Sequence, residues 1–451
     1  MSAAAQRTID WEAITDEAVA LLSEYVRIDT TNPPGNESLA CDWLATLFDA
    51  EGIAWRRIDP GPEAGAPHST SAGRASLIAT LPGDGSRGGP LVLLHHTDVV
   101  PIEREHWAEE PFAGAVRDGH VWGRGTIDMK GMAVMELLVL LLHRRLGLPL
   151  GRDLTLLAVA DEEAGGHWGV EFLDRAHPQL LDCDYVINEG GMGSQETFGV
   201  EKPVFTIGVS EKGPLWLTLR TSGRPGHGSV PYADAALDRL VRALTRIEAW
   251  QRPLRLVPEV RAHLQALHEA GVLPEPPTTE TLAALAEQQP RLRSLQRASV
   301  ALTGVTAGMK HNVIPAQAEA TLDVRLLPGD DPERFLDELA SVIDDPAIEV
   351  ETVFASSTAA SPVDTELYSA MAQAARSVVE GAAVVPGIST GFTDSRVFRR
   401  RGIPAYGFVP VLLSPQESGR AHGNDERISI ENLRIGVEIL FRSVRAVCAP
   451  S

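Results

Sequence analysis

Five short stretches of the sequence concentrate residue types that bind metal ions and transfer protons. They are HHTDVVP (95–101), GRGTIDMKG (123–131), DEEAGG (161–166), NEGG (188–191) and AHGNDE (421–426). Four of them lie just beyond a run of residues that reads as a strand, or in the loop that follows one. Imidazole and carboxylate groups are ligands that Zn²⁺, Co²⁺ and Mn²⁺ take in proteins. These stretches therefore predict a metal site assembled from distant parts of the chain.

The first stretch contains two histidines, and strand geometry separates them. Successive side chains of a strand point to opposite faces, so His96 and Asp98 share one side while His95 and Thr97 point to the other. A histidine alone at a strand end is most often an ordinary surface or core residue. A His-x-Asp pair at the carboxyl end of a buried strand favours a site, because α/β sheets bind ligands there. We therefore expect His96 rather than His95 to contact a bound ion.

The other stretches add carboxylates. In DEEAGG three adjacent acidic residues repel one another, and after a buried strand this arrangement makes more sense if a cation neutralises it. GRGTIDMKG is not a phosphate-binding loop, because the GxxxxGK[ST] spacing is absent. If the strand ends meet at one crevice, the side chains gathered there are His96, Asp128, Glu162, Glu163, Glu189 and His422. Such a set is about large enough for two divalent cations that share a bridging carboxylate.

Buried strands that alternate with helices are needed to bring these stretches together. Apolar runs at 75–81, 91–100, 154–160 and 183–190 read as strands, and helical spacing of apolar residues marks 11–27, 38–52 and 131–145. Near-continuous apolar strands alternating with helices are typical of α/β proteins with a mostly parallel sheet. We therefore expect an α/β fold whose sheet is flanked by helices.

The pattern changes after about residue 205. VFTIGVSEKGPLWLTLRTSG alternates apolar and polar residues, as an antiparallel hairpin with one open face does. A long helical stretch follows from ALDRLVRALTRIEAW (236–250) to about 300, with extra helices at about 245–300. A second alternating strand, a helix and a last strand come after it. This β-α-β-β-α-β order resembles an α+β split-βαβ sandwich. The predicted organisation is an inserted domain at 206–356, within a discontinuous domain formed by 1–205 and 357–451.

Composition limits the partners and the compartment. The 451 residues include 40 basic and 61 acidic ones, and the net charge of −21 argues against binding nucleic acid or an anionic membrane surface. Three distant cysteines form no disulfide framework, which fits a reducing compartment. The N-terminus lacks a signal-peptide pattern, and no apolar stretch is long enough to span a membrane. We expect a soluble, cytoplasmic protein without nucleic-acid or membrane partners.

The motifs together resemble the M20 family of metallopeptidases and amidohydrolases, which includes carboxypeptidases, aminoacylases and acetylornithine deacetylase. The resemblance runs from VRIDTTNPPGNE (26–37) to AHGNDERI (421–428). HTDVVP, GRGTIDMKG, DEEAGG, GRPGHGSVP and HGNDE appear in the family's order and spacing. The resemblance implies a zinc-exopeptidase-like catalytic domain, and an inserted domain that acts as a lid and forms a homodimer.

The resemblance also implies two divalent metal ions as cofactors, most simply Zn²⁺, with Co²⁺ or Mn²⁺ as alternatives. The residues that would bind them are His96, Asp128, Glu163, Glu189 and His422. In this scheme His96 binds one ion, Asp128 bridges both, and Glu189 and His422 complete the second site.

Three further residues receive catalytic roles from the same resemblance. Glu162 would be the general base, which takes a proton from a metal-bridged water and delivers it to the leaving amine. Asp98 would orient His96. His227, from the inserted domain, would stabilise the oxyanion, often by reaching into the partner subunit's site. Taken alone, His227 between two glycines reads as an exposed loop residue.

Several residues match positions that contact substrate in the family. They are Asn312, Arg325, Gly391, Asp394 and Arg396. Arg325 could pair bidentately with a substrate carboxylate, and an ordinary surface arginine at a strand end is an equal alternative.

The predicted function is hydrolysis of an amide or peptide bond in a small substrate with a free carboxylate, such as a dipeptide, a C-terminal residue or an N-acyl amino acid. Two alternatives stay open. The same scaffold could hydrolyse another C–N bond, of carbamoyl or formimidoyl type, or the chain could be a non-catalytic descendant that binds a ligand. The presence of Glu162 favours catalysis, because a binding protein has no need of a general base.

Overall fold

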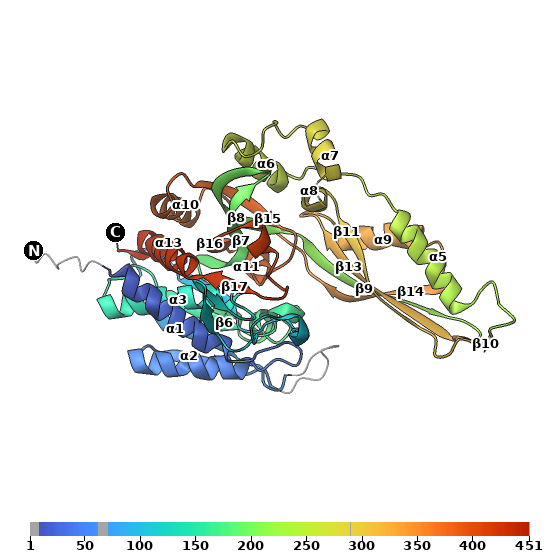
Figure 1. Cartoon of the computed structure of the whole chain (residues 1–451), viewed down its shortest axis with the longest axis horizontal. Helices are drawn as coiled ribbons and strands as arrows, with labels where there is room; N and C mark the ends of the chain where they lie inside the picture. Colours follow the sequence, from blue (N-terminus) through green and yellow to red (C-terminus); the bar gives the residue numbers. More distant parts are fainter. Residues whose placement is uncertain (1–8, 62–70, 289, 451) are drawn as a thin grey trace, which may run out of the picture.

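The chain folds around two main β-sheets, which the computed structural model describes for residues 9–61, 71–288 and 290–450 (Figure 1). The ends of the predicted catalytic domain, residues 1–8 and 451, lie outside the described residues. Eight strands form the larger sheet, in the order β1 (Trp55–Ile58), β2 (Ser76–Leu81), β6 (Leu154–Val159), β3 (Leu91–His96), β7 (Tyr185–Thr197), β16 (Ala405–Leu413), β8 (Val200–Glu211) and β15 (Ala383–Ser389). The central strands β6, β3, β7 and β16 run parallel, as do β8 and β15. The predicted α/β class with a mostly parallel central sheet is confirmed.

Helices cover both faces of the larger sheet. Leu91 and Leu93 of β3 lie in one core with α1 (Trp11–Val26), α2 (Glu37–Glu51), α3 (Lys130–Leu146), α10 (Glu366–Val378) and α13 (Ile430–Cys448). Val92 and Leu94 face a second core with α4 (Val170–Ala176) and α11 (Ser395–Arg400). Because β3 is buried on both faces, its sequence is a continuous apolar run rather than an alternating one.

The smaller sheet is antiparallel, with strand order β11 (Ser299–Ala307), β13 (Gln317–Leu326), β9 (Gly213–Ser222) and β14 (Ile348–Ala355). One face packs on α5 (Ala236–Ala249) and α9 (Pro332–Ile343), so buried and part-exposed residues alternate along β13. The predicted β-α-β-β-α-β order is present, with further helices between α5 and β11. Because β8 pairs with β15 in the larger sheet, the first junction lies at Lys212 rather than at residue 206.

The extra helices form a core of their own, separate from the core of the smaller sheet. These are α6 (Pro258–Glu269), α7 (Thr279–Gln288) and α8 (Pro290–Leu295). Their apolar residues share a core with Val204 of β8 and with Val385 and Ile388 of β15. They therefore cover the β8–β15 edge of the larger sheet, and Figure 1 shows them above that edge.

Short strands complete the fold. The strands β4 (Ala115–Arg117), β5 (His120–Trp122) and β17 (Arg427–Ser429) form a small sheet beside the larger one. The pair β10 (Gly226–His227) and β12 (Val313–Ile314) lies at the far tip of the inserted domain, and α12 (Pro415–Ser418) follows β16 (Figure 1). No helix in the described part of the chain is long and apolar enough to cross a bilayer.

Candidate metal centre and substrate cavity

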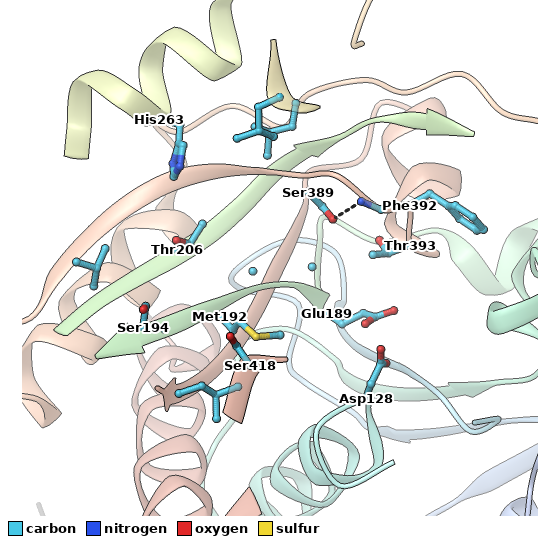
Figure 2. Close-up of a pocket in the computed structure, with 18 of the residues that line it drawn as sticks. Asp128, Glu189, Met192, Ser194, Thr206, His263, Ser389, Phe392, Thr393 and Ser418 are labelled. Atoms are coloured by element: carbon cyan, nitrogen blue, oxygen red, sulfur yellow. Dashed lines mark hydrogen bonds between the residues drawn. The ribbon is translucent and has the colours of Figure 1, made fainter. Parts of the chain in front are cut away.

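The expected ligands converge because the strands that carry them are neighbours. His96 is the last residue of β3, Glu162 follows β6, and Glu189 lies in β7, and β3 pairs in parallel with both β6 and β7. The carboxyl ends of these strands therefore open on the same edge of the sheet. Asp128 stands just before α3, and its carboxylate and that of Glu189 point toward one another (Figure 2).

Asp128 lies between the two histidines. Its Oδ1 is 3.1 Å from Nε2 of His96, and its Oδ2 is 3.0 Å from Nε2 of His422. Oε1 of Glu189 lies 3.6 Å from Nε2 of His96, and Oε1 of Glu163 lies 3.3 Å from Nε2 of His422. The distances thus pair Glu189 with His96, not with His422 as the family resemblance implied. The reason is that β7 is the direct neighbour of β3 in the sheet.

The chemistry of this cluster fits divalent cations. The donor atoms of His96, Asp128 and Glu163 lie within 4.8 Å of one another, as do those of His96, Glu162 and Glu189. Burial, followed by the charge of a neighbouring carboxylate, raises the pKa of Glu162, Glu163 and Glu189. Crowded, buried carboxylates are costly unless a cation neutralises them. Mixed imidazole and carboxylate donors are a set that Zn²⁺, Co²⁺ or Mn²⁺ accepts.

Asp98 holds three parts of the site in place. Its Oδ1 accepts a hydrogen bond from the backbone N–H of Glu162, and its Oδ2 accepts one from that of Glu163, both at 3.1 Å. Nδ1 of His96 lies 2.9 Å from the backbone oxygen of Asp98 and 3.5 Å from its carboxylate. Asp98 therefore positions the two glutamates through its side chain and His96 chiefly through its backbone.

A buried polar network behind Asp98 was not predicted. Asn32 donates to the carboxylates of Asp98 (2.8 Å) and Asp161 (3.2 Å). Arg74 donates to the side-chain oxygen of Asn32 and also pairs with Glu37. The signal that could have found it is the segment TNPPGNE, which carries Asn32 and Glu37 and belongs to the family resemblance.

Glu426 is a second residue that the sequence did not single out. Its two carboxylate oxygens accept hydrogen bonds from the backbone N–H groups of Gly125, Ile127 and Asp128, and from the guanidinium of Arg124. This buried carboxylate shapes the glycine-rich loop that presents Asp128. Glu426 belongs to the same HGNDE stretch that carries His422, and that stretch was the available signal.

A cavity of about 650 Å³ opens from the carboxylate cluster. Glu162, Glu163 and Glu189 line one part of it, and Arg325 of β13 and Gly391 line another. Nε and Nη2 of Arg325 donate to Asp323, whereas its buried Nη1 has no hydrogen-bond partner among the described residues. Figure 2 shows the cavity wall running from Asp128 and Glu189 to His263 of α6.

Two of the expected substrate contacts lie behind the cavity wall instead. Arg396 is fully buried, and it donates to the backbone oxygens of Thr393 and Gly165. Asp394 is buried beside it, and burial raises the pKa of Asp394 to about 7. In this structure Arg396 joins the loops that follow β6 and β15, and neither side chain reaches the cavity. Substrate contact at Gly391 stays a prediction.

His227 and Asn312 are not brought to the cluster within one chain. Both are exposed at the β10–β12 tip, where Nδ1 of His227 lies 2.7 Å from Oγ of Ser229. Neither lines the cavity. Figure 1 places β10 at the end of the molecule away from the larger sheet.

His95 points away from the cluster, as strand alternation predicts. Its Nδ1 lies 2.8 Å from Oε2 of Glu136 on α3, and both side chains are fully buried. Burial lowers the pKa of His95 to about 3 and raises the pKa of Glu136, so burial favours the uncharged form of both side chains.

Comparison with known proteins gives the family. Residues 92–446, which include every ligand candidate, match the model of the peptidase family M20/M25/M40. The chain belongs to this family. Membership confirms the predicted enzyme class, an M20-type hydrolase of amide bonds.

Two relatives are similar over most of their length. The N-fatty-acyl-amino acid synthase/hydrolase PM20D1 of Xenopus tropicalis is 31% identical over 373 residues, which cover 79% of this chain and 72% of that protein. Aminoacylase-1A of Rattus norvegicus is 28% identical over 439 residues, which cover 96% of this chain and 95% of that protein.

Solved structures share the fold at lower identity. The M20 family metallo-carboxypeptidase Sso-CP2 from Sulfolobus solfataricus has a TM-score of 0.73 at 20% identity, covering 96% of this chain and 99% of its own. Human carnosine dipeptidase 1 has a TM-score of 0.69 at 17% identity, and the match covers 97% of this chain and 98% of the dipeptidase chain. These matches support the architecture of the whole chain.

Proposed function

We propose that this M20 enzyme hydrolyses the amide bond of N-acyl amino acids with two divalent metal ions. The observation that carries the proposal is a single cavity that joins the ligand cluster to Arg325. The cluster offers donors for cations, and Nη1 of Arg325 offers a hydrogen bond to the free carboxylate of an amino acid. The names of two relatives, aminoacylase-1A and N-fatty-acyl-amino acid synthase/hydrolase, favour acylated amino acids over peptides.

The metal ligands divide into two sets that share Asp128. His96 and Glu189 would hold one ion with Asp128, and Glu163 and His422 would hold the other, as the ion-pair distances suggest. When bound, the ions would make a water molecule more acidic and polarise the scissile carbonyl. Zn²⁺ is the simplest occupant, and Co²⁺ or Mn²⁺ would suit the same donors.

Glu162 is the proposed general base. It accepts a proton from the attacking water on a carboxylate oxygen and returns that proton to the amine nitrogen as the C–N bond breaks. The side chain lines the cavity, and Asp98 fixes its backbone. Only 6% of Glu162 is exposed, so bulk water has little access to compete for its proton.

His227 and Asn312 would complete the site from a second copy of the chain. Their place at the exposed tip of the inserted domain suits a homodimer in which each tip reaches the partner subunit's cavity. There the imidazole N–H of His227 would donate to the oxyanion.

The test is a comparison of substrate classes. The Zn²⁺- or Co²⁺-loaded protein is assayed with N-acyl amino acids, dipeptides and N-carbamoyl amino acids. We expect kcat/KM for the best N-acyl amino acid to exceed that for any dipeptide or N-carbamoyl amino acid by at least about tenfold, or about 1.4 kcal/mol of transition-state binding. A dipeptide or N-carbamoyl substrate that is turned over faster would overturn the assignment.

The same assay tests the role of Arg325 with a matched substrate. An N-acyl amino acid is compared with its C-terminal methyl amide, which lacks the carboxylate. The wild type should favour the free acid, and the Arg325→Met variant should lose that preference because the charge-assisted hydrogen bond is gone. An unchanged preference would place the carboxylate elsewhere in the cavity.

A further inference from the structure

An aromatic cluster joins the inserted domain to the catalytic domain. Trp216 of β9 and Phe354 of β14 belong to the smaller sheet, and Phe392 belongs to the loop after β15. The ring centroids lie 5.2 Å (Trp216–Phe354), 5.9 Å (Trp216–Phe392) and 5.7 Å (Phe354–Phe392) apart, and all three side chains are partly exposed. Aromatic pairs attract one another at such spacings. The three rings therefore form one contact between the domains.

The pairing of the strands explains why these rings and Arg325 meet. Trp216 lies opposite Asp323 of β13 and opposite Phe354 of β14. Arg325 follows Asp323 by two residues, so its side chain points to the same face of the smaller sheet. The neighbouring Val324 points to the other face, into the core that α5 and α9 cover. The face without these helices is thus the one that meets the catalytic domain.

Phe392 links Arg325 to the catalytic domain. The guanidinium carbon of Arg325 lies 4.9 Å from the ring centroid of Phe392, within the range of a cation–π contact. Asp323 also holds Arg325, through two hydrogen bonds, but both residues belong to β13. Those bonds cannot fix Arg325 relative to the catalytic domain, whereas the contact with Phe392 can. Phe392 and Arg325 both line the cavity, and Figure 2 shows Phe392 on the side that carries Glu189.

The same ring is linked to the loop that carries Glu162. The guanidinium carbon of Arg396 lies 5.0 Å from the ring centroid of Phe392. Nη2 of Arg396 donates to the backbone oxygen of Gly165 at 2.7 Å, and the N–H of Gly165 donates to the backbone oxygen of Glu162 at 2.8 Å. A Cβ atom added at Gly165 would lie 3.5 Å from the ring of Phe354, so that ring lies against this loop. Phe392 is thereby linked, through Arg396, to the loop of the proposed general base.

We propose that Phe392 is a positioning residue, which holds Arg325 at a fixed distance from Glu162 and so sets the spacing between carboxylate and scissile bond that a substrate must have. The proposal rests on the N-acyl amino acid hydrolase activity proposed above, in which Arg325 binds the free carboxylate. One carbon separates the carboxylate from the amide nitrogen in an N-acyl α-amino acid, and two carbons do so in an N-acyl β-amino acid. If Arg325 is fixed for the first spacing, the amide bond of the second is misplaced, and a misplacement of about 1 Å can cost about 10²-fold in rate.

The experiment compares two isomeric substrates, N-acylalanine and N-acyl-β-alanine, that carry the same acyl group. kcat/KM is measured for both isomers with the metal-loaded wild type and with the Phe392→Leu variant. We expect the wild type to favour the α isomer by at least about tenfold, and Phe392→Leu to lower that ratio by at least about fivefold. The fall should come chiefly from a lower kcat/KM for the α isomer. Phe392→Tyr, which keeps the ring, should keep the ratio of the wild type.

Phe335→Leu is the matched control. Phe335 lies in the core of the inserted domain, outside the lining of the catalytic cavity, and its ring centroid is 4.7 Å from the guanidinium carbon of Arg252. This variant loses the same kind of contact, so it should change kcat/KM for both isomers alike. If Phe392→Leu does not fold, Phe354→Leu takes its place, because Phe354 contacts both Phe392 and the loop at Gly165.

Three results would overturn the proposal and leave amide hydrolysis intact. They are a wild type that does not favour the α isomer, a ratio in Phe392→Leu within about twofold of the wild type, and an equal fall of the ratio in Phe335→Leu. A Phe392→Tyr variant as impaired as Phe392→Leu would also contradict it, because the ring would then not be what holds Arg325. If no N-acyl α-amino acid is hydrolysed by the wild type, the proposed function itself fails, and this inference with it.

Discussion

Asp128 is the residue around which the candidate metal ligands are arranged. One of its carboxylate oxygens faces His96, the other faces His422, and Glu426 holds its backbone N–H. Burial opposes the ionisation of this side chain, but hydrogen bonds from His422 and His96 lower the pKa of Asp128 below its usual value. It is therefore a carboxylate at neutral pH, in the position that a bridging ligand needs.

The residues of the candidate site could be predicted from the sequence, but which of them lie next to one another could not. Placement after buried strands selected His96 and Glu189, because strand ends and side-chain alternation are local properties. The pairing of Glu189 with His96 depends on the order of strands in the sheet, which local patterns do not reveal. The role of Glu426 depends on a contact with Ile127, 299 residues earlier in the chain.

The two adjacent histidines provide a matched test at this scale. His96→Ala should lower both the bound metal and the activity, because an imidazole ligand is lost. His95→Ala should leave the metal content near that of the wild type and lower stability by about 1–3 kcal/mol, because the buried carboxyl of Glu136 loses its partner. Metal analysis and denaturant unfolding measure the two effects. The reverse pattern would mean that the register assigned to β3 is wrong.

At the scale of elements, periodicity predicted which segments form helices and strands but not what covers them. The helix α3 and the strands β3 and β6 could be predicted because continuous apolar runs reflect burial on all sides. The extra helices at about 245–300 were predicted as part of the inserted domain, yet α6 packs on β15 of the larger sheet. An amphipathic helix shows that it has an apolar face, and only the fold decides which partner buries that face.

The loop after β15 shows the same limit. Gly391, Asp394 and Arg396, which were expected to contact substrate, belong to one stretch, TGFTDSR (390–396), yet they lie in different places. Gly391 lines the cavity, whereas Arg396 lies behind it and holds the loop after β6 through the backbone oxygen of Gly165. The residue type alone could not decide between binding a substrate and binding a backbone oxygen, since a guanidinium does both.

At the scale of the whole molecule, the inserted domain separates residues that the proposed mechanism needs together. Its β13 brings Arg325 to the cavity, while its tip carries His227 and Asn312 away from it. Sequence order could not distinguish these two outcomes, because all three residues belong to the same insertion. In the proposed homodimer, the tip residues of one chain would lie at the cavity of the other chain.

Mixing two inactive variants tests this arrangement. Glu162→Gln and His227→Ala proteins are each purified, exchanged into mixed dimers and assayed. If His227 acts across the dimer, each mixed dimer has one complete site, and about a quarter of wild-type activity should return. If it acts within one chain, mixed dimers have no complete site and no activity returns. The unmixed variants are the controls.

The central claim is that Glu162 moves the proton while other residues hold the metal ions, and one variant tests it most directly. The Glu162→Gln protein, which keeps the shape of the side chain, is measured for both bound metal and kcat/KM on its best substrate. We expect about two metal ions per chain, as in the wild type, and a kcat/KM lower by about 10²–10⁴-fold. Activity within tenfold of the wild type, or the loss of one metal ion, would contradict the account, since the latter would make Glu162 a ligand.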